Sequence, residues 1–317
     1  MEMKHRAALI ALSLCAGLIG AGPGRYPRQD AKKEGFSVDI SVIAITISVT
    51  VQDRGGRYIN DLTEKDFAVF ENNRKRPLTY FQYDFEAPVS LTILLDVSGS
   101  MAVQDKLAEV KACLHSFLFS VLKPRDEVSL LIFADGAVEV AVRHTTAKDE
   151  VWGALEKTEA FGKTALNDAV GVSPEFANKG RHEKRALLLM TDGVENDSQC
   201  SPDQALEVAR RVDVPIYTIG TKIPLDEDAL RKLKKNPAAT PSGIAATLER
   251  FSRATGGKAF FTRSPEEVTA ALRDIKDEMS RQYIIGYTAY KNLTNEYRHI
   301  RVTTPKKNTR VRTRQGY

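Results

Sequence analysis

Cysteine and tryptophan are scarce in this chain, which has three cysteines and one tryptophan among 317 residues. A disulfide framework of the kind that stabilises small secreted domains is therefore excluded. After the N-terminal segment only Cys113 and Cys200 remain. A bond between them is possible in an oxidising compartment, but Cys113 lies on the apolar face of a predicted helix and Cys200 in a loop. We therefore favour two separate thiols.

The chain also lacks a strong charge of either sign and a second long apolar run. The formal net charge is +5, and nucleic-acid binding usually comes with a stronger, clustered basic surface. The apolar stretch Ile40 to Val51 is too short to cross a bilayer and is rich in β-branched residues, which favours a strand. We predict no nucleic-acid partner and no transmembrane span in the mature chain.

The first 22 residues have the layout of a secretory signal peptide. Lys4 and Arg6 precede an apolar core from Ala7 to Ile19, and small residues follow it up to Gly22. We therefore expect an exported protein that is periplasmic or extracellular, with association with the cell envelope as a further alternative.

Composition and periodicity divide the remainder into a flexible leader (23–35), a β-rich flank (36–88), a central α/β domain (89–281) and a C-terminal β-rich flank (282–317). We expect the two flanks to pack together as one small β domain. In the central domain strands alternate with helices, which predicts a doubly wound, mostly parallel six-stranded sheet with helices on both faces. The predicted strands are Leu91–Leu95, Val128–Phe133, Val138–Val142, Ala186–Met190, Ile216–Ile219 and Ala259–Phe261.

Oxygen-bearing side chains follow two of these strands. Asp96, Ser98 and Ser100 come directly after the first strand, and Asp192 follows the fourth. In a sheet of order 3-2-1-4-5-6 these strands are neighbours, and ligands collect at the switch point between them. Thr164, at the start of the helix before the fourth strand, can reach the same point. Hard oxygen ligands of this kind suit Mg²⁺ rather than a soft metal.

This set resembles the metal-ion-dependent adhesion site of von Willebrand factor type A domains. The resemblance implies that Asp96, Ser98, Ser100, Thr164 and Asp192 hold Mg²⁺ or Mn²⁺ and leave a position open for a carboxylate of a partner protein. It also implies a binding module without catalytic activity.

Further segments are similar to a bacterial exported subfamily in which β segments flank this domain: Asp61 to Phe67, Val69 to Glu71 and Arg314 to Tyr317. Lys163 stands where the family more often has glycine, and we expect its side chain to point to solvent.

Two other functions compete with this interpretation. An enzyme could use Ser98 as a nucleophile, but the chain has no Gly-x-Ser-x-Gly elbow and no Walker phosphate loop. A structural envelope component could use the metal for stability alone. Separately, Arg310, Arg312 and Arg314 alternate along one predicted strand. They could dock an acidic partner, although we favour a solvated outer face.

Overall fold

The computed structural model describes residues 42–193, 195–223, 243–290 and 296–317. The chain divides into two units, Met1–Asp39 and Ile40–Tyr317, and every described element belongs to the second. The predicted signal peptide and the leader lie outside the described residues. Within the described ranges, no helix has both the length and the apolar character needed to cross a membrane.

The central sheet has six strands in the order β10-β9-β8-β5-β6-β7. When the six strands of this sheet are numbered in chain order and read from β7 to β10, the order is 3-2-1-4-5-6, as predicted. The fold class is therefore confirmed. All neighbours are parallel except β6 and β7, which form an antiparallel hairpin. The strands are β5 (Val89–Asp96), β6 (Glu127–Ala134), β7 (Ala137–Thr145), β8 (Lys184–Thr191), β9 (Ile216–Thr221) and β10 (Ala259–Thr262).

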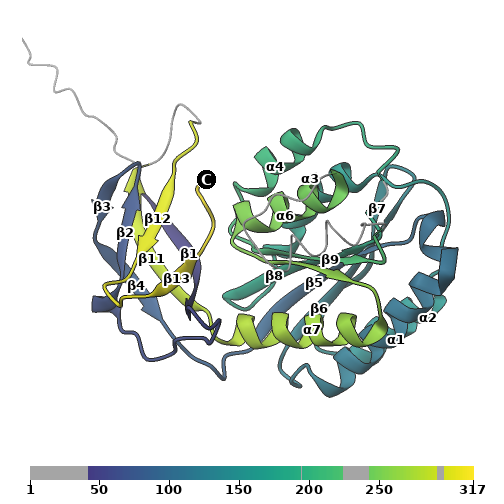
Figure 1. The fold of residues 1–317 in the computed structure, drawn as a ribbon, viewed down its shortest axis with the longest axis horizontal. Coiled ribbons are helices and arrows are strands. Elements are labelled where there is room, and N and C mark those ends of the chain that lie inside the picture. Colours follow the sequence, from purple (N-terminus) through teal and green to yellow (C-terminus); the bar gives the residue numbers. More distant parts are fainter. Residues whose placement is uncertain (1–41, 194, 224–242, 291–295) are drawn as a thin grey trace, which may run out of the picture. The chain divides into compact units, whose positions relative to one another are not determined.

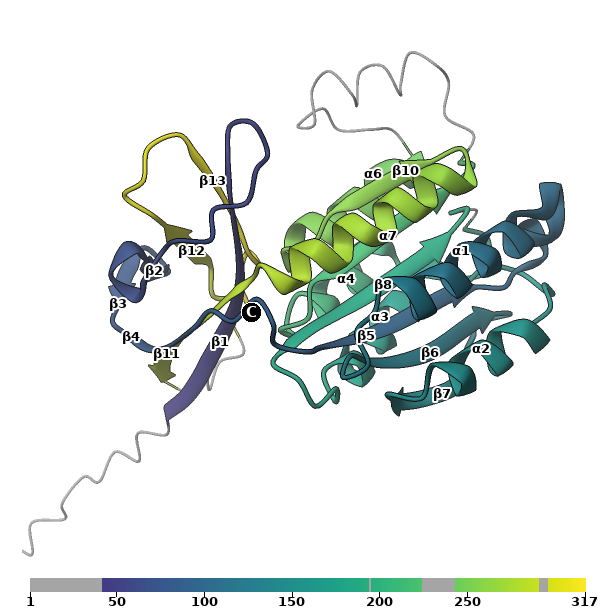
Figure 2. The same ribbon diagram turned by 90° about the horizontal axis from the view of Figure 1, so that it is seen from below.

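Helices cover both faces of this sheet (Figures 1 and 2). One apolar core joins the sheet to α1 (Lys106–Ser120), α2 (Lys148–Lys157) and α7 (Pro265–Ser280). The other joins it to α3 (Leu166–Ala177), α4 (Pro202–Ala209) and α6 (Gly243–Thr255). Strands buried on both faces explain why β5 reads as a continuous apolar run. Cys113 packs in the first core and Cys200 against the second, so the sheet separates these two free thiols.

The two β-rich flanks share their sheets. The strand β1 (Val42–Asp53) pairs antiparallel with β11 (Tyr283–Tyr290) and, further along, with β13 (Thr309–Arg312). The four-stranded order is β13-β1-β11-β4, and a second sheet has the order β12-β2-β3. The remaining strands of these two sheets are β2 (Ala68–Glu71), β3 (Arg74–Arg76), β4 (Leu78–Gln82) and β12 (Ile300–Thr303), and a short 3₁₀ turn, η1 (Glu64–Asp66), precedes β2.

A buried carboxylate ties the two ends of the flanks together. Glu71 accepts hydrogen bonds from the Tyr317 hydroxyl (2.7 Å), from Arg298 Nη1 (2.9 Å) and from Arg76 Nε (2.7 Å). Two of the segments that carry the subfamily resemblance, Val69 to Glu71 and Arg314 to Tyr317, therefore meet in space.

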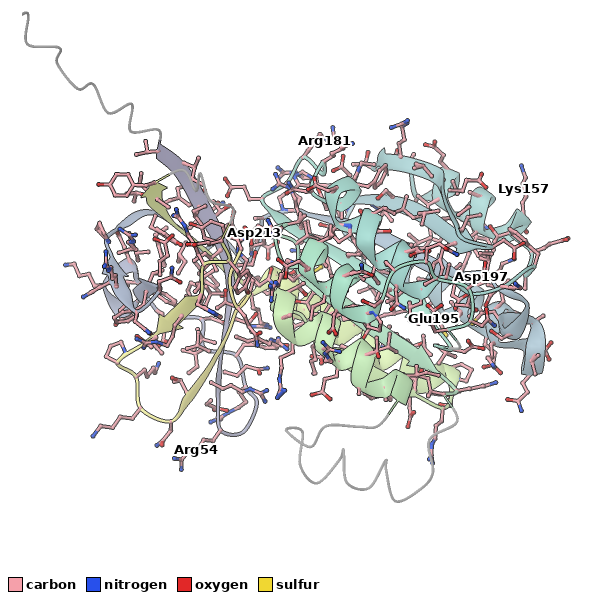
Figure 3. The ribbon with its side chains drawn as sticks, turned by 90° about the horizontal axis from the view of Figure 1, so that it is seen from above. Arg54, Lys157, Arg181, Glu195, Asp197 and Asp213 are labelled. Atoms are coloured by element: carbon pink, nitrogen blue, oxygen red, sulfur yellow. The ribbon has the colours of Figure 1, made fainter. Side chains whose placement is uncertain are left out.

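The expectation of a solvated outer face for Arg310, Arg312 and Arg314 is wrong for two of these three arginines. Arg312 forms an ion pair with Glu278 of α7. Arg314 is only 5% exposed, donates to the Thr46 carbonyl oxygen (2.9 Å) and lies 3.4 Å from Asp213, which is labelled in Figure 3. Spacing along a strand does not reveal the acidic partners of these cations, which come from distant parts of the chain.

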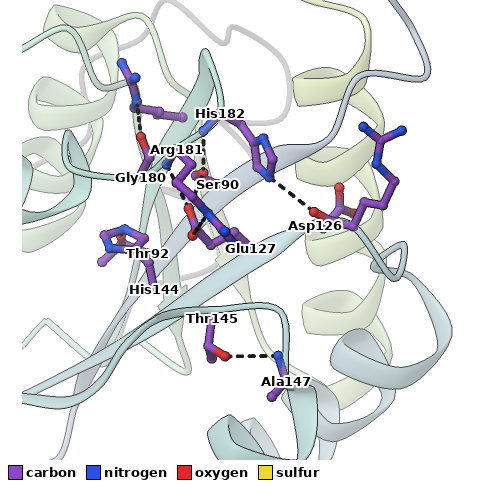
Figure 4. A network of polar contacts seen from close by, with 12 residues as sticks. Ser90, Thr92, Asp126, Glu127, His144, Thr145, Ala147, Gly180, Arg181 and His182 are labelled. Carbon is purple, nitrogen blue, oxygen red and sulfur yellow. Dashed lines mark hydrogen bonds and ion pairs between the residues drawn. The ribbon is translucent and has the colours of Figure 1, made fainter.

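A network of polar contacts fixes the amino ends of β5 and β6 (Figure 4). Ser90 Oγ donates to Glu127 Oε2 (2.7 Å), and Arg181 donates to Glu127 through both its backbone N–H (2.8 Å) and its Nε (2.7 Å). The backbone N–H of His182 donates to Ser90 Oγ (3.1 Å). These bonds hold the edge of the sheet that lies opposite the predicted metal ligands.

Candidate metal centre

The two predicted aspartate ligands stand at the carboxyl ends of neighbouring parallel strands. Asp96 is the last residue of β5, and Asp192 directly follows β8. The two strands pair in register, with Leu95 opposite Met190. Because their ends meet at the switch point of the sheet, residues almost a hundred positions apart in the sequence come together.

A continuous chain of hydrogen bonds joins four of the five predicted residues. The backbone N–H of Ser98 donates to Asp96 Oδ1 (2.9 Å), and the hydroxyls of Ser98 and Ser100 lie 3.1 Å apart. Ser100 Oγ then donates to Asp192 Oδ1 (3.0 Å). Ser98 is the N-cap residue of the 3₁₀ segment η2 (Gly99–Asp105), which turns the chain so that both hydroxyls face the same point.

Thr164 joins this group through its backbone. Its N–H donates to Asn196 Oδ1 (2.9 Å), and its carbonyl oxygen accepts from the N–H groups of Asn196 (3.2 Å) and Asp197 (3.0 Å). The N–H of Gly99 donates to the Gly162 carbonyl oxygen (2.9 Å), which ties the Thr164 loop to the serine loop. Among the described residues, none forms a hydrogen bond with the Thr164 hydroxyl, although this residue is buried beside the others.

Burial dominates the electrostatics of Asp96. It raises the pKa of this carboxyl to about 6, against the opposing effect of hydrogen bonds from Thr191 and Ser98, and the charge of Asp192 raises it further. Thr191 Oγ1 donates to Asp96 Oδ2 at 2.5 Å. Sequence reasoning missed Thr191, although its position directly before Asp192 places it at the end of the same strand.

A lysine that sequence reasoning missed also contacts the group. Lys106 Nζ donates to Asp192 Oδ2 at 2.7 Å, and the lysine side chain is 11% exposed. Both carboxylate oxygens of Asp192 therefore have partners, a hydroxyl and an ammonium group. No pattern in the sequence marks Lys106, because a lysine at the start of a helix is ordinarily solvated.

The donor chemistry of the group fits a hard cation. Two carboxylates and three hydroxyls offer only oxygen, which Mg²⁺ and Mn²⁺ accept and which soft metals do not favour. In the described part of the chain, no three or more His, Cys, Asp or Glu side chains form a possible metal site. Any metal held here therefore depends on the serine and threonine hydroxyls.

Lys163 lies at the rim of the site. Its side chain is 66% exposed and forms an ion pair with Asp197 Oδ1 at 3.0 Å. Glu195 and Asp197, labelled in Figure 3, belong to the loop that follows β8. Glu195 Oε2 accepts from the backbone N–H of Asn167 in the first turn of α3 (3.2 Å), so this loop also fixes the start of the helix that follows Thr164.

Two curated proteins are similar to part of the chain. An uncharacterized protein of Synechocystis sp. is 27% identical over 178 residues, which are 54% of this chain and 40% of that protein. An uncharacterized protein of Borreliella burgdorferi is 25% identical over 142 residues, 42% of this chain and 41% of that protein. The chain thus spans about two fifths of the length of the curated relatives it matches.

Among solved structures, a von Willebrand factor type A protein from Catenulispora acidiphila aligns at a TM-score of 0.49 and 11% identity, covering 78% of this chain and 71% of that one. The conserved hypothetical protein BatB from Bacteroides thetaiotaomicron aligns at 0.47 and 18% identity, covering 61% and 99%. The model of the von Willebrand factor type A domain family matches residues 90–257, which is more than half of the 317 residues. This chain therefore belongs to the von Willebrand factor type A domain family.

Proposed function

We propose that this chain is an exported protein-binding module that holds Mg²⁺ or Mn²⁺ and captures an acidic side chain of a partner protein. The ligands would be Asp96, Ser98, Ser100, Thr164 and Asp192. The observation that carries the proposal is the unbroken hydrogen-bonded chain from Asp96 through Ser98 and Ser100 to Asp192, at the carboxyl ends of β5 and β8.

The balance of charge in this group favours binding over structural sequestration of the metal. Only two of the five donors are charged, and one of these, Asp192, already shares its charge with Lys106. A bound divalent cation would supply a Lewis-acidic position for an anionic oxygen. Gly99 is exposed and Ser100 half-buried, so the group opens to the surface at the serine loop.

Apolar side chains at the rim support a protein as the partner. Phe161 is 53% exposed, and its backbone N–H donates to the Val97 carbonyl oxygen (2.8 Å), which anchors it beside the serine loop. Val103, in η2, is also exposed. Exposed aromatic and aliphatic side chains next to a charged centre supply the apolar contacts that protein interfaces use around a central anchor.

Catalysis is not part of the proposal. The hydroxyl of Ser98 has Ser100 as its side-chain partner, and no histidine of the described residues donates to it or accepts from it. A serine nucleophile needs a general base within hydrogen-bond reach.

Calorimetric titration with MgCl₂ and MnCl₂ tests the metal site directly. We expect binding to the wild type, none to Asp96→Ala, and unchanged binding to Asp149→Ala, which removes an exposed carboxylate from α2. Absence of binding to the wild type would contradict the proposal.

Capture of partners from an envelope extract, in Mg²⁺ and in EDTA, tests whether the chain binds a partner protein through the metal. The module predicts partners that are retained in Mg²⁺ and lost both in EDTA and with Asp96→Ala. Partners that are unchanged by EDTA, together with a lower melting temperature in EDTA, would instead favour a metal with a purely structural role.

A further inference from the structure

We propose that Lys106 is a resident cation of this site, which stabilises the metal-free state and competes with the divalent metal for Asp192. The inference rests on the proposed metal site and concerns its regulation. It begins from the contact between Lys106 Nζ and Asp192 Oδ2, at 2.7 Å, in which the aspartate side chain is 1% exposed.

Apart from this contact, the position of Lys106 is unfavourable for a positive charge. It is the first residue of α1, where the helix dipole disfavours a positive charge. Its side chain is almost completely buried, which penalises an ammonium group that lacks an anionic partner. Because Asp192 is the carboxylate that offsets these costs, the lysine is placed for this contact and not for solvation.

The loop before α1 is held in an uncommon conformation that delivers Lys106 to the site. Gln104 and Asp105 both adopt left-handed backbone angles, with φ of 56° and 55°. Such angles in two consecutive residues other than glycine persist only where the surroundings impose them. Lys222 Nζ links this loop to α1, because it donates to the Gln104 carbonyl oxygen (3.2 Å) and to Glu109 (2.8 Å).

Without a metal, Lys106 compensates the charge of the two buried carboxylates. Asp96 and Asp192 face each other at the ends of adjacent strands with side chains that water hardly reaches. A divalent cation that approaches Asp192 meets the ammonium group on the same carboxylate, and like charges repel strongly at such sites. Metal binding must therefore displace the ammonium group or tolerate its repulsion, and either effect weakens the measured affinity.

The test is calorimetric titration of Lys106→Met and Lys106→Gln with MnCl₂ and MgCl₂, with melting temperatures measured in EDTA. We expect both variants to bind metal at least about tenfold more tightly than the wild type, because the competing charge is gone. We expect Lys106→Met to melt at a lower temperature in EDTA, and saturating Mn²⁺ to reduce the difference from the wild type. Lys106→Gln keeps a donor for Asp192 and serves as the measurable variant should Lys106→Met fail to fold without metal.

Lys163→Met is the control, since it removes an exposed cation at the rim of the site that pairs with Asp197 and not with Asp192. Its metal affinity should stay within about twofold of the wild type, and a gain equal to that of Lys106→Met would reduce the effect to general electrostatics and overturn the inference. Wild-type metal binding with equal or weaker binding by both Lys106 variants would overturn it while leaving the proposed function intact. Absence of metal binding to the wild type and to all variants would overturn the proposed function, and this inference with it.

Discussion

Replacing Glu278 by glutamine should destabilise the folded protein. Among the described residues of α7, Glu278 is the one that forms an ion pair with Arg312. The Glu278 side chain is 1% exposed and that of Arg312 is 17% exposed. Glu278 also accepts hydrogen bonds from the Tyr217 hydroxyl (2.6 Å) and the Tyr58 hydroxyl (3.3 Å). It is therefore the centre of a buried polar group that joins α7 to β13, β9 and the loop after β1.

The expected cost follows from the ion that is left behind. Removing one partner of a buried ion pair typically costs about 3–5 kcal/mol, because the remaining charge is desolvated without compensation. The glutamine oxygen can still accept from one of the two tyrosines, which donate to different oxygens of Glu278, and Arg312 keeps some access to water. The lower end of the range, about 3 kcal/mol, therefore applies to Glu278→Gln. The assay is urea unfolding at neutral pH, followed by circular dichroism.

A double substitution separates the ion pair from the loss of packing. Glu278→Gln combined with Arg312→Met removes both charges and should recover about half or more of the lost stability. Asp274→Asn is the control, because Asp274 also lies 3.3 Å from the Tyr58 hydroxyl but is partly exposed and should cost less than about 1 kcal/mol. A loss below about 1 kcal/mol for Glu278→Gln, or a double variant as unstable as the sum of the single ones, would refute the reasoning.

Three other substitutions test separate parts of the molecule. Burial lowers the pKa of Lys184 to about 8, so the folded state loses this proton at a lower pH than the unfolded state does. The free energy of unfolding of the wild type, relative to that of Lys184→Met, should therefore rise by about 2 kcal/mol between about pH 7.5 and pH 9.5 in urea unfolding. A difference that does not change with pH would contradict this assignment. Phe161→Ala should weaken partner capture severalfold while calorimetry finds the metal affinity unchanged, and a parallel loss of metal binding would mean that the rim and the metal site are not separable. Gly162 has φ of +67° and a Cβ there would overlap the Asp135 carboxylate, so Gly162→Ala should shift the Thr164 loop and lower metal affinity severalfold in the same titration, whereas Gly153→Ala, in open space on α2, should not.

The sequence predicted the central sheet well because its strands are buried on both faces. Such strands appear in the sequence as apolar runs with oxygen-bearing residues at their ends, and these runs located β5 and β8. The strand order followed from the doubly wound fold class. The short basic strand β3 was missed, since Arg74–Arg76 has neither alternation nor apolar side chains and is a strand only because β2 pairs with it. Tertiary pairing of this kind leaves no local signal.

The sequence also did not predict which carboxylates pair with the buried cations. Arg312 was expected to be solvated and Lys106 was not singled out at all. Both are paired with carboxylates from other parts of the chain, Glu278 and Asp192. A motif identifies ligands that are contiguous or that follow strands of known order. It does not identify a charge that reaches the same point from the start of a neighbouring helix.

The net charge of the site connects the proposed capture of an acidic partner with the proposed competition between Lys106 and the metal. Asp96, Asp192 and Lys106 together carry one negative charge when both carboxylates are ionised, and a divalent cation would turn this into one positive charge. A partner carboxylate is attracted to that excess. Without the lysine charge the metal-bound site is neutral, so Lys106→Met should hold its metal more tightly and yet capture an acidic partner more weakly. If the site binds as proposed, affinity for the metal and affinity for the acid are therefore opposed through one ammonium group.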